Sequence, residues 1–323
     1  MEDNFRDFLI RMKPYVDGGI AAVLMKKTED FDDEMRLLLL KGKRLRGCLL
    51  LYVADLLREP DQPLTALPAL DLAVAVELAH SASLILDDML DEDCTRRGLP
   101  TLHLSRGQKQ AMLDTIGVLT LPYDLAGAHG QVYTQSLAET QRRMASGVLR
   151  EMIRKPDLPA SRLYDTIITK KTGCLFGLAT GWGCMVAEGP ERAHFYEWRR
   201  WGIHVGKTMQ IADDIADLLA IERDDRGKKP WGSEALLLLL SADHAAKELA
   251  TDLKDLTLHP EKAKLLLSHA GVKEALKEHM IEETTAAMEI LLKMEMDPDA
   301  FKLLGQVPFI IEDIMISEVT DGN

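Results

Sequence analysis

The sequence predicts an all-α protein. Aromatic residues make up only 5% of its 323 residues, whereas leucine, alanine and methionine are abundant. Runs that alternate β-branched and polar residues are hard to find, and glycine and proline divide the chain into long segments with helical periodicity. The acidic motif described below recurs, but no Gly/Ser-rich linker, low-complexity tract or other internal repeat is present. We therefore predict one domain over residues 1–323.

The periodic segments define the expected helices, in order. They cover residues 31–57, 65–93, 106–150, 159–187, 191–222, 233–256, 272–295 and 299–318. Within the segment 106–150, breaks are expected near Pro122 and at residues 127–130. The run from Leu236 to Leu240 is apolar around the whole helix, which indicates burial between neighbouring helices or at a subunit interface.

The net charge of −13 argues against a general nucleic-acid-binding protein, whose affinity depends on neutralising phosphates with lysine and arginine. An anionic ligand would need local cations, and these occur in small groups, each of which alone is usually solvated surface. The groups are Lys41, Lys43, Arg44 and Arg46; Arg96 and Arg97; Lys170 and Lys171; and Lys228 and Lys229.

Cysteine spacing and hydropathy indicate the compartment. Cys48, Cys94, Cys174 and Cys184 lie far apart without a CxxC pair, which disfavours a zinc knuckle or a disulfide scaffold. We find no signal-peptide core and no run of about 18 apolar residues. A cytoplasmic protein without a transmembrane segment is expected.

One short acidic motif occurs twice, as DDMLD and DDIAD. The aspartates are Asp87, Asp88 and Asp91, and Asp213, Asp214 and Asp217. On a helix the outer carboxylates of each motif lie one turn apart and repel one another. Divalent cations relieve that repulsion, because Mg²⁺ prefers carboxylate oxygens and completes its shell with substrate phosphates. A solvated acidic helix end is the alternative, but the first motif directly follows the apolar stretch 82–86, which favours burial.

Cations follow each motif. Arg96 and Arg97 come after the first, where guanidinium groups can bind phosphate oxygens bidentately, and Lys228 comes after the second on a glycine-containing loop. His80 precedes Asp87 by seven residues, two turns along the same helix face, and alone would be interpreted as a core histidine. Two acidic motifs with trailing cations predict a diphosphate site.

These residues resemble the polyprenyl synthetase family, the trans-isoprenyl diphosphate synthases that include farnesyl and geranylgeranyl diphosphate synthases. The resemblance covers roughly residues 40 to 232. It rests on GKRLRG at Gly42 to Gly47, the first motif with its trailing RRG and PTLH, KTG at Lys171 to Gly173, Gln210 with the second motif, and GK at Gly227 and Lys228. It implies an isoprenoid synthase-type bundle of about ten or more helices around a central cavity, and a homodimer.

The resemblance also implies the reaction, in which isopentenyl diphosphate is condensed with an allylic diphosphate (dimethylallyl, geranyl or farnesyl) by ionisation, condensation and proton elimination. It assigns about three Mg²⁺ ions per active site to Asp87, Asp91 and Asp213, with Asp88, Asp214 and Asp217 completing or supporting the cluster. By motif position, the residues that bind the allylic diphosphate are Arg96, Lys171 and Lys228. Those that bind isopentenyl diphosphate are Lys43, Arg46, His80 and Arg97. Lys171, Thr172 and Gln210 match the catalytic positions, with the Thr172 and Gln210 oxygens facing the carbocation.

Product length in this family depends on side-chain bulk before the first motif. Ala82, Ser83 and, further up the helix, Ala79 are small, which favours a geranylgeranyl or longer product. Alternatively, Ala82 and Ser83 merely permit close helix packing.

The chain departs from the family pattern at Gly47, where most members have proline, and in the shortened segment after Trp231. Two other functions remain open at this stage. One is a class I terpene cyclase or head-to-head condensing enzyme, against which GKRLRG, His80 and Arg97 count. The other is a non-catalytic subunit of a heteromeric prenyl synthase, against which the intact acidic motifs count.

Overall fold

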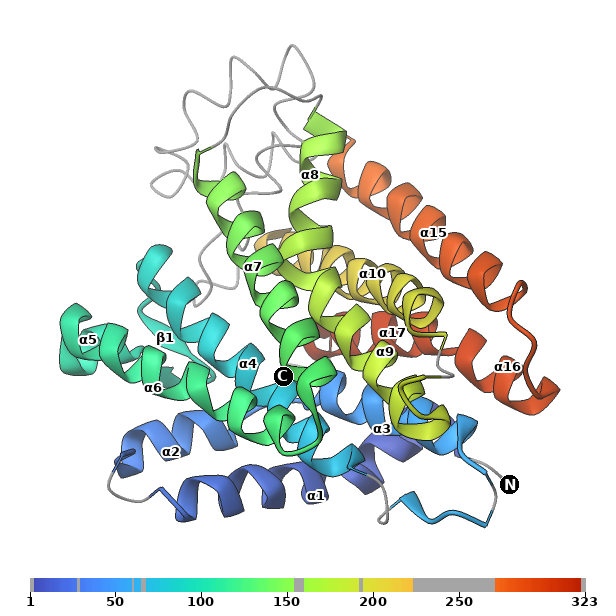
Figure 1. The fold of residues 1–323 in the computed structure, drawn as a ribbon. Helices are drawn as coiled ribbons and strands as arrows, with labels where there is room; N and C mark the ends of the chain where they lie inside the picture. The colour runs from blue at the N-terminus through green and yellow to red at the C-terminus, as the bar shows by residue number, and fades with distance from the viewer. Residues whose placement is uncertain are drawn as a thin grey trace. The chain divides into compact units, whose positions relative to one another are not determined.

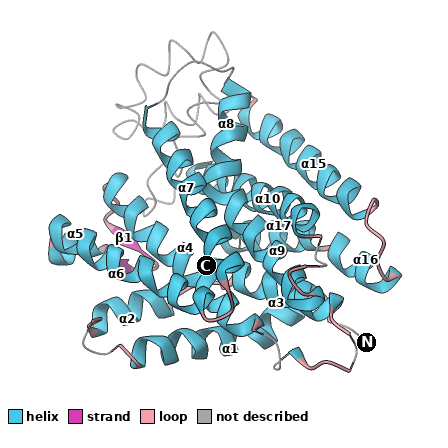
Figure 2. Cartoon of the chain, viewed as in Figure 1, coloured by secondary structure: helices cyan, strands magenta, loops and turns pink. Residues whose placement is uncertain are grey.

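The computed structural model describes residues 3–27, 30–59, 61–64, 68–153, 160–191, 194–222 and 271–320. Most of these residues are helical (Figures 1 and 2), so the all-α prediction is confirmed. Contacts divide the chain into two compact units, which are residues 1–139 with 178–198, and residues 140–177 with 199–323. The single domain stays a prediction. The predicted helix 233–256, the run 236–240 and the segment after Trp231 lie outside the described residues.

The first unit begins with α1 (Phe5–Met25), a helix that the sequence analysis missed. Asn4 caps it by accepting hydrogen bonds from the backbone N–H groups of Arg6 and Asp7. The helix continues through Pro14, and its buried side includes Phe8 and Ile20. A Cβ atom added at Gly19 would lie 2.6 Å from a methyl group of Val74, so this glycine permits the close approach of α1 to α4.

Residues 31–57 form two helices where one was predicted. These are α2 (Asp33–Leu40) and α3 (Leu45–Leu57). The break occurs because Arg44 adopts the left-handed conformation, with φ of 60°, which no α-helix can contain. Lys41 and Lys43 therefore lie on a loop rather than on a helix.

Helix α4 (Ala69–Leu90) is the core of the first unit and contacts α1, α3 and α6. Among the described residues it is the one helix long and apolar enough to cross a membrane by composition, which the sequence analysis overlooked. However, 67% of its most apolar stretch is buried inside the protein, and a buried core helix meets the same criterion. We predicted a helix over residues 65–93, and α4 is shorter at both ends.

A two-stranded hairpin follows α4, and the described part of the first unit also includes four helices, in whole or in part, and the first residues of α10 (Phe195–Glu222). The hairpin pairs β1 (Thr95–Arg96) with β2 (Leu99–Pro100). The helices are α5 (Leu102–Arg106), α6 (Gln108–Gly127), the start of α7 (Gln131–Ile153) and the end of α9 (Cys174–Glu188). The expected break at Pro122 is wrong, because α6 continues through it, whereas the break at residues 127–130 is confirmed.

The second unit contains the end of α7, the start of α9 and most of α10 (Phe195–Glu222). Its other elements are α8 (Ala160–Ile168), a π-helical turn (Thr169–Gly173), α15 (Val272–Leu291), α16 (Pro298–Gly305) and α17 (Val307–Thr320). A Cβ atom at Gly206 would lie 2.9 Å from the Cα atom of Gly173, so glycines let α10 pack closely against this turn. That contact brings the turn beside the second acidic motif.

Candidate active site

The first acidic motif ends α4. Asp87 is half-buried and Asp91 is exposed one turn later, where its N–H donates to the Asp87 carbonyl over 2.8 Å. Asp88 is buried and accepts a hydrogen bond of 2.6 Å from Arg96 Nε. Burial raises the pKa of Asp88, and the Arg96 guanidinium opposes that shift. The outer two aspartates are thus the more accessible members, while Arg96 neutralises the buried one.

The hairpin after the motif presents both arginines of the RRG segment. Arg97 and Gly98 form its two-residue turn with φ values of 53° and 74°, as a type I′ turn requires. The Arg97 guanidinium donates to the carbonyl of Lys41, and Lys41 Nζ donates to the Arg97 carbonyl over 3.2 Å. These reciprocal bonds hold the hairpin against the loop that carries Lys43.

The charges of four arginines act on His80 of α4. The imidazole is half-buried, and burial together with the charges of Arg46, Arg97, Arg44 and Arg96 lowers its pKa well below the usual value. His80 is therefore neutral near pH 7 and can donate one hydrogen bond. The charges of Arg46 and Arg97 therefore act on His80 within the first unit. The positive potential of these two arginines favours an anionic ligand.

Arg44 belongs to the same basic segment, but it is buried and supports the fold. Its Nε donates to Asp17 over 2.6 Å, its second terminal nitrogen donates to the Leu39 carbonyl over 2.8 Å, and Glu77 lies 3.8 Å away. Glu77 in turn accepts a 2.7 Å hydrogen bond from the N–H of Gly47. Proline has no N–H, so the departure from the family pattern at Gly47 creates this bond.

The residues predicted to set product length lie on α4. Ala79 and Ala82 are buried, and Ser83 is half-buried with its hydroxyl donating to the His80 carbonyl over 2.8 Å. A small pocket of about 220 Å³ also lies along α4, but none of these three residues lines it. Its lining is Leu38, Ser81, Leu84, Ile85, Asp88, Arg96 and Arg97.

The second acidic motif lies on α10, and as in the first motif its middle aspartate is the most buried one. Asp213 and Asp217 are half-buried, whereas Asp214 is buried. Gln210 Nε2 donates to Asp214 Oδ1 over 3.1 Å, and the Tyr164 hydroxyl donates to Asp214 Oδ2 over 2.5 Å. Neutral donors therefore hold the middle aspartate here, where a guanidinium does so in the first motif.

Two predicted catalytic residues join this network through the π-helical turn. The Thr172 hydroxyl donates to Gln210 Oε1 over 2.7 Å, which fixes the orientation of the Gln210 amide. Lys171 Nζ lies 2.8 Å from Glu151 on α7. The structure thus brings Thr172, Gln210 and Asp214 together in the second unit. Lys228 lies outside the described residues.

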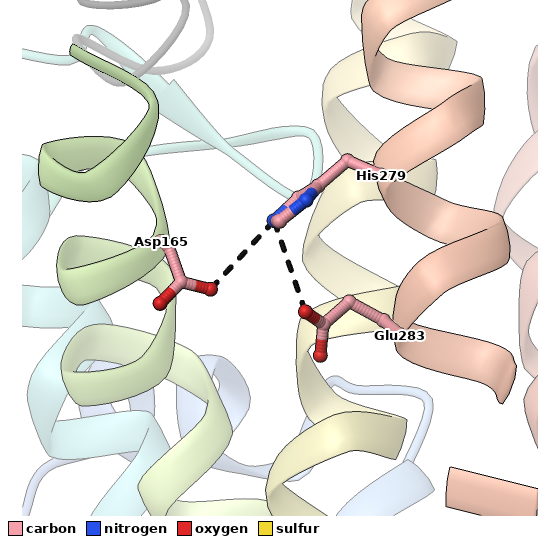
Figure 3. Close-up of side chains that lie close together, drawn as sticks. All are labelled: Asp165, His279 and Glu283. Atoms are coloured by element: carbon pink, nitrogen blue, oxygen red, sulfur yellow. Dashed lines mark ion pairs between the residues drawn. The ribbon is translucent and has the colours of Figure 1, made fainter. Parts of the chain in front are cut away.

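A charged cluster that the sequence analysis missed lies beside this network. Asp165, His279 and Glu283 offer ligand atoms within 4.8 Å of one another (Figure 3), from α8 and α15. However, the ammonium group of the buried Lys207 contacts Asp165 and lies 2.5 Å from Glu283, so a cation already occupies the cluster. His279, 3.7 Å away, and Lys207 lower the pKa of Asp165 to about 2. We interpret the cluster as ion pairs rather than as a metal site.

Comparison with solved structures identifies the fold. The solved structure of a polyprenyl synthase from Caulobacter crescentus CB15, complexed with calcium and isoprenyl diphosphate, has a TM-score of 0.76, with 23% identity over 97% of this chain and 99% of that one. The fold is therefore that of the all-α prenyl synthases.

Sequence comparison identifies the family. A geranylgeranyl diphosphate synthase from Pseudescherichia vulneris is 32% identical over 64% of this chain and 70% of its own length. A short chain isoprenyl diphosphate synthase from Methanocaldococcus jannaschii is 31% identical over 85% of this chain and 80% of its own. The family model "Polyprenyl synthetase" matches residues 29–254. The chain belongs to the polyprenyl synthetase family and is a prenyltransferase, and this family uses a divalent metal.

Proposed function

We propose that the chain condenses isopentenyl diphosphate with an allylic diphosphate to give an all-trans geranylgeranyl or longer diphosphate. The observation that carries the proposal is the basic region of the first unit, where hydrogen bonds hold the Arg97 hairpin against the loop of Lys41 and where the charges of Arg46 and Arg97 act on His80. Isopentenyl diphosphate keeps its diphosphate during the reaction, so cations are sufficient to bind it. Arg46 and Arg97 supply the positive charge, and the neutral His80 supplies an N–H donor. A terpene cyclase has no use for this second diphosphate site.

The two acidic motifs are proposed to hold Mg²⁺ at the allylic diphosphate. Carboxylate oxygens are the ligands that Mg²⁺ prefers, and such oxygens are offered by the accessible Asp87 and Asp91 in the first unit and by the half-buried Asp213 in the second. Bound Mg²⁺ would stabilise the charge that develops on the departing diphosphate. Arg96 and Lys171 would bind the same diphosphate after exchanging their present partners, Asp88 and Glu151.

Measuring the length of the product tests two assignments together, namely the substrates and the role of Ala82 and Ser83 in limiting chain length. Wild-type protein incubated with Mg²⁺, radiolabelled isopentenyl diphosphate and each allylic primer is expected to release geranylgeranyl or longer diphosphates. Ala82→Phe is expected to shorten the product, because an aromatic ring at this buried position obstructs the growing tail. Ser83→Phe repeats the test at a half-buried position that tolerates bulk more readily.

Thin-layer chromatography of the dephosphorylated alcohols measures the chain length. Leu84→Phe is the matched control, since Leu84 lies on the same helix but lines the small pocket near Arg96, and its product should keep the wild-type length. If both Ala82→Phe and Ser83→Phe leave the product length unchanged, these positions do not limit the length of the product. Hydrocarbon products from the wild type would instead identify a cyclase.

We further propose that two copies of the chain associate through α6. Met112, Leu113 and Ile116 are 50%, 68% and 55% exposed and share one face of the helix, opposite the buried face that includes Val118. Met112→Asp combined with Ile116→Asp is expected to convert a dimer to a monomer in size-exclusion chromatography with light scattering. Ile10→Asp, at an exposed apolar residue of α1, is the control. A mass unchanged by the double substitution excludes α6 as the interface.

A further inference from the structure

The hydroxyl of Tyr164 donates a hydrogen bond of 2.5 Å to Oδ2 of Asp214. Both side chains are about 1% exposed, so water does not substitute for either. The sequence analysis assigned no role to Tyr164. We propose that Tyr164 is a positioning residue for the second acidic motif, fixing the Asp214 carboxylate and, through it, the Gln210 amide. This inference rests on the proposed metal site.

The tyrosine is the donor in this bond. Burial and the neighbouring Asp214 and Asp213 charges raise the pKa of Tyr164, so its hydroxyl keeps the proton. A hydrogen bond donated to a carboxylate is stronger than one between neutral groups, and it stabilises the charged form in a buried place. Tyr164 therefore helps to keep a negative charge next to Asp213 without adding a positive charge that would repel a metal ion.

The position of Asp214 determines the orientation of Gln210. Asp214 Oδ1 accepts from Gln210 Nε2, which leaves Gln210 Oε1 to accept from Thr172. If the Asp214 carboxylate rotated, Gln210 Nε2 would lose its acceptor. The Gln210 amide could then flip, so that its nitrogen rather than its oxygen faced Thr172. The Tyr164 hydroxyl prevents that rotation by holding the other carboxylate oxygen.

The charged cluster in turn fixes Tyr164. Its neighbour Asp165 pairs with Lys207 on α10 and with His279 on α15, and the Tyr164 ring packs edge-on against the His279 ring with centroids 5.9 Å apart. Lys207 also pairs with Glu283. Adjacent residues of α8 are thereby attached to α10 at two points, the ammonium of Lys207 and the carboxylate of Asp214.

Tyr164→Phe tests the inference because it removes one oxygen and keeps the ring contact. We expect the Kd for Mn²⁺ alone, measured by electron paramagnetic resonance, to rise about 10-fold, as is usual when a supporting hydrogen bond behind a metal site is lost. The kcat should fall by a similar factor, while the KM for isopentenyl diphosphate stays unchanged because that site lies in the first unit. The Tm should fall by a few degrees, because the buried Asp214 carboxylate loses one donor but keeps that of Gln210.

Tyr133→Phe is the matched control, since Tyr133 is also a buried tyrosine that packs edge-on against an aromatic ring, in the first unit. Its Mn²⁺ affinity should equal that of the wild type. If Tyr164→Phe loses stability but keeps wild-type Mn²⁺ affinity and kcat, the hydroxyl is only structural and the proposal is overturned. If phenylalanine prevents folding, 4-aminophenylalanine at position 164 offers a weaker donor of similar size and should raise the Mn²⁺ Kd by a smaller factor, and an unchanged Kd would overturn the proposal equally.

Asp213→Ala separates this inference from the proposed function. If Asp213→Ala binds Mn²⁺ as the wild type does, the metal assignment itself fails. If Asp213→Ala loses Mn²⁺ and Tyr164→Phe does not, only the role of Tyr164 is wrong.

Discussion

Asp213→Ala is expected to lower kcat by about 10²–10³-fold and to leave the binding of isopentenyl diphosphate nearly unchanged. The carboxylate is half-buried beside a fixed Asp214, so its removal takes a proposed metal ligand without disturbing the buried network. Ionisation of the allylic diphosphate is the difficult step, and it depends most on electrostatic stabilisation of the leaving group. Steady-state kinetics and equilibrium dialysis with labelled isopentenyl diphosphate measure the two quantities separately.

The control for this substitution is Asp55→Ala. Asp55 is half-buried and pairs with Arg58 at 2.8 Å on the surface of α3, where loss of a carboxylate costs little. Its kcat should stay close to that of the wild type, since Asp55 belongs to neither acidic motif and its loss changes stability only slightly. A near-normal rate in Asp213→Ala would show that the second motif does not act through a metal ion.

Arg44→Met is expected to have the largest effect on stability, lowering the free energy of unfolding by about 3–5 kcal/mol. The guanidinium is completely buried and interacts with Asp17, Glu77 and the Leu39 carbonyl. Methionine fills much of the volume but leaves Glu77 without its buried cation. Urea unfolding followed by circular dichroism measures the change.

The exposed Lys109 on α6 supplies the comparison for Arg44. Lys109→Met also replaces a cation by methionine, but at the surface. The free energy of unfolding of this variant should differ from that of the wild type by no more than about 0.5 kcal/mol. Equal stability of the Arg44→Met protein and the wild type would contradict the structural role of Arg44 and return it to the candidate ligand-binding groups.

The fold class and most helices were predictable because apolar periodicity is a local property. Helix α1 was not, since Pro14, Gly18 and Gly19 are typical of breaks, whereas in the structure Gly19 permits the approach of α1 to α4. The break between α2 and α3 was missed for a related reason. A left-handed arginine at position 44 is maintained by tertiary partners that local sequence does not reveal.

The candidate site was predictable motif by motif, because each motif is short and lies on one helix or loop. The sequence could not distinguish the middle aspartate of each motif from its neighbours, since burial separates them. It also could not show that Arg44 pairs with Asp17 and Glu77, which lie far from it along the chain. Tyr164 and the Lys207 cluster were also missed. Their partners lie far along the chain, since Asp214 follows Tyr164 by 50 positions and Glu283 follows Lys207 by 76, and no local spacing connects them.

The most direct measurement is a crystal structure of the protein with Mg²⁺, isopentenyl diphosphate and an allylic thiolodiphosphate that ionises slowly. The account predicts metal ions ligated by Asp87, Asp91 and Asp213 and by oxygens of the allylic analogue, with the diphosphate of isopentenyl diphosphate contacting Arg46, His80 and Arg97. Two acidic motifs with no metal ion or diphosphate in common would contradict it.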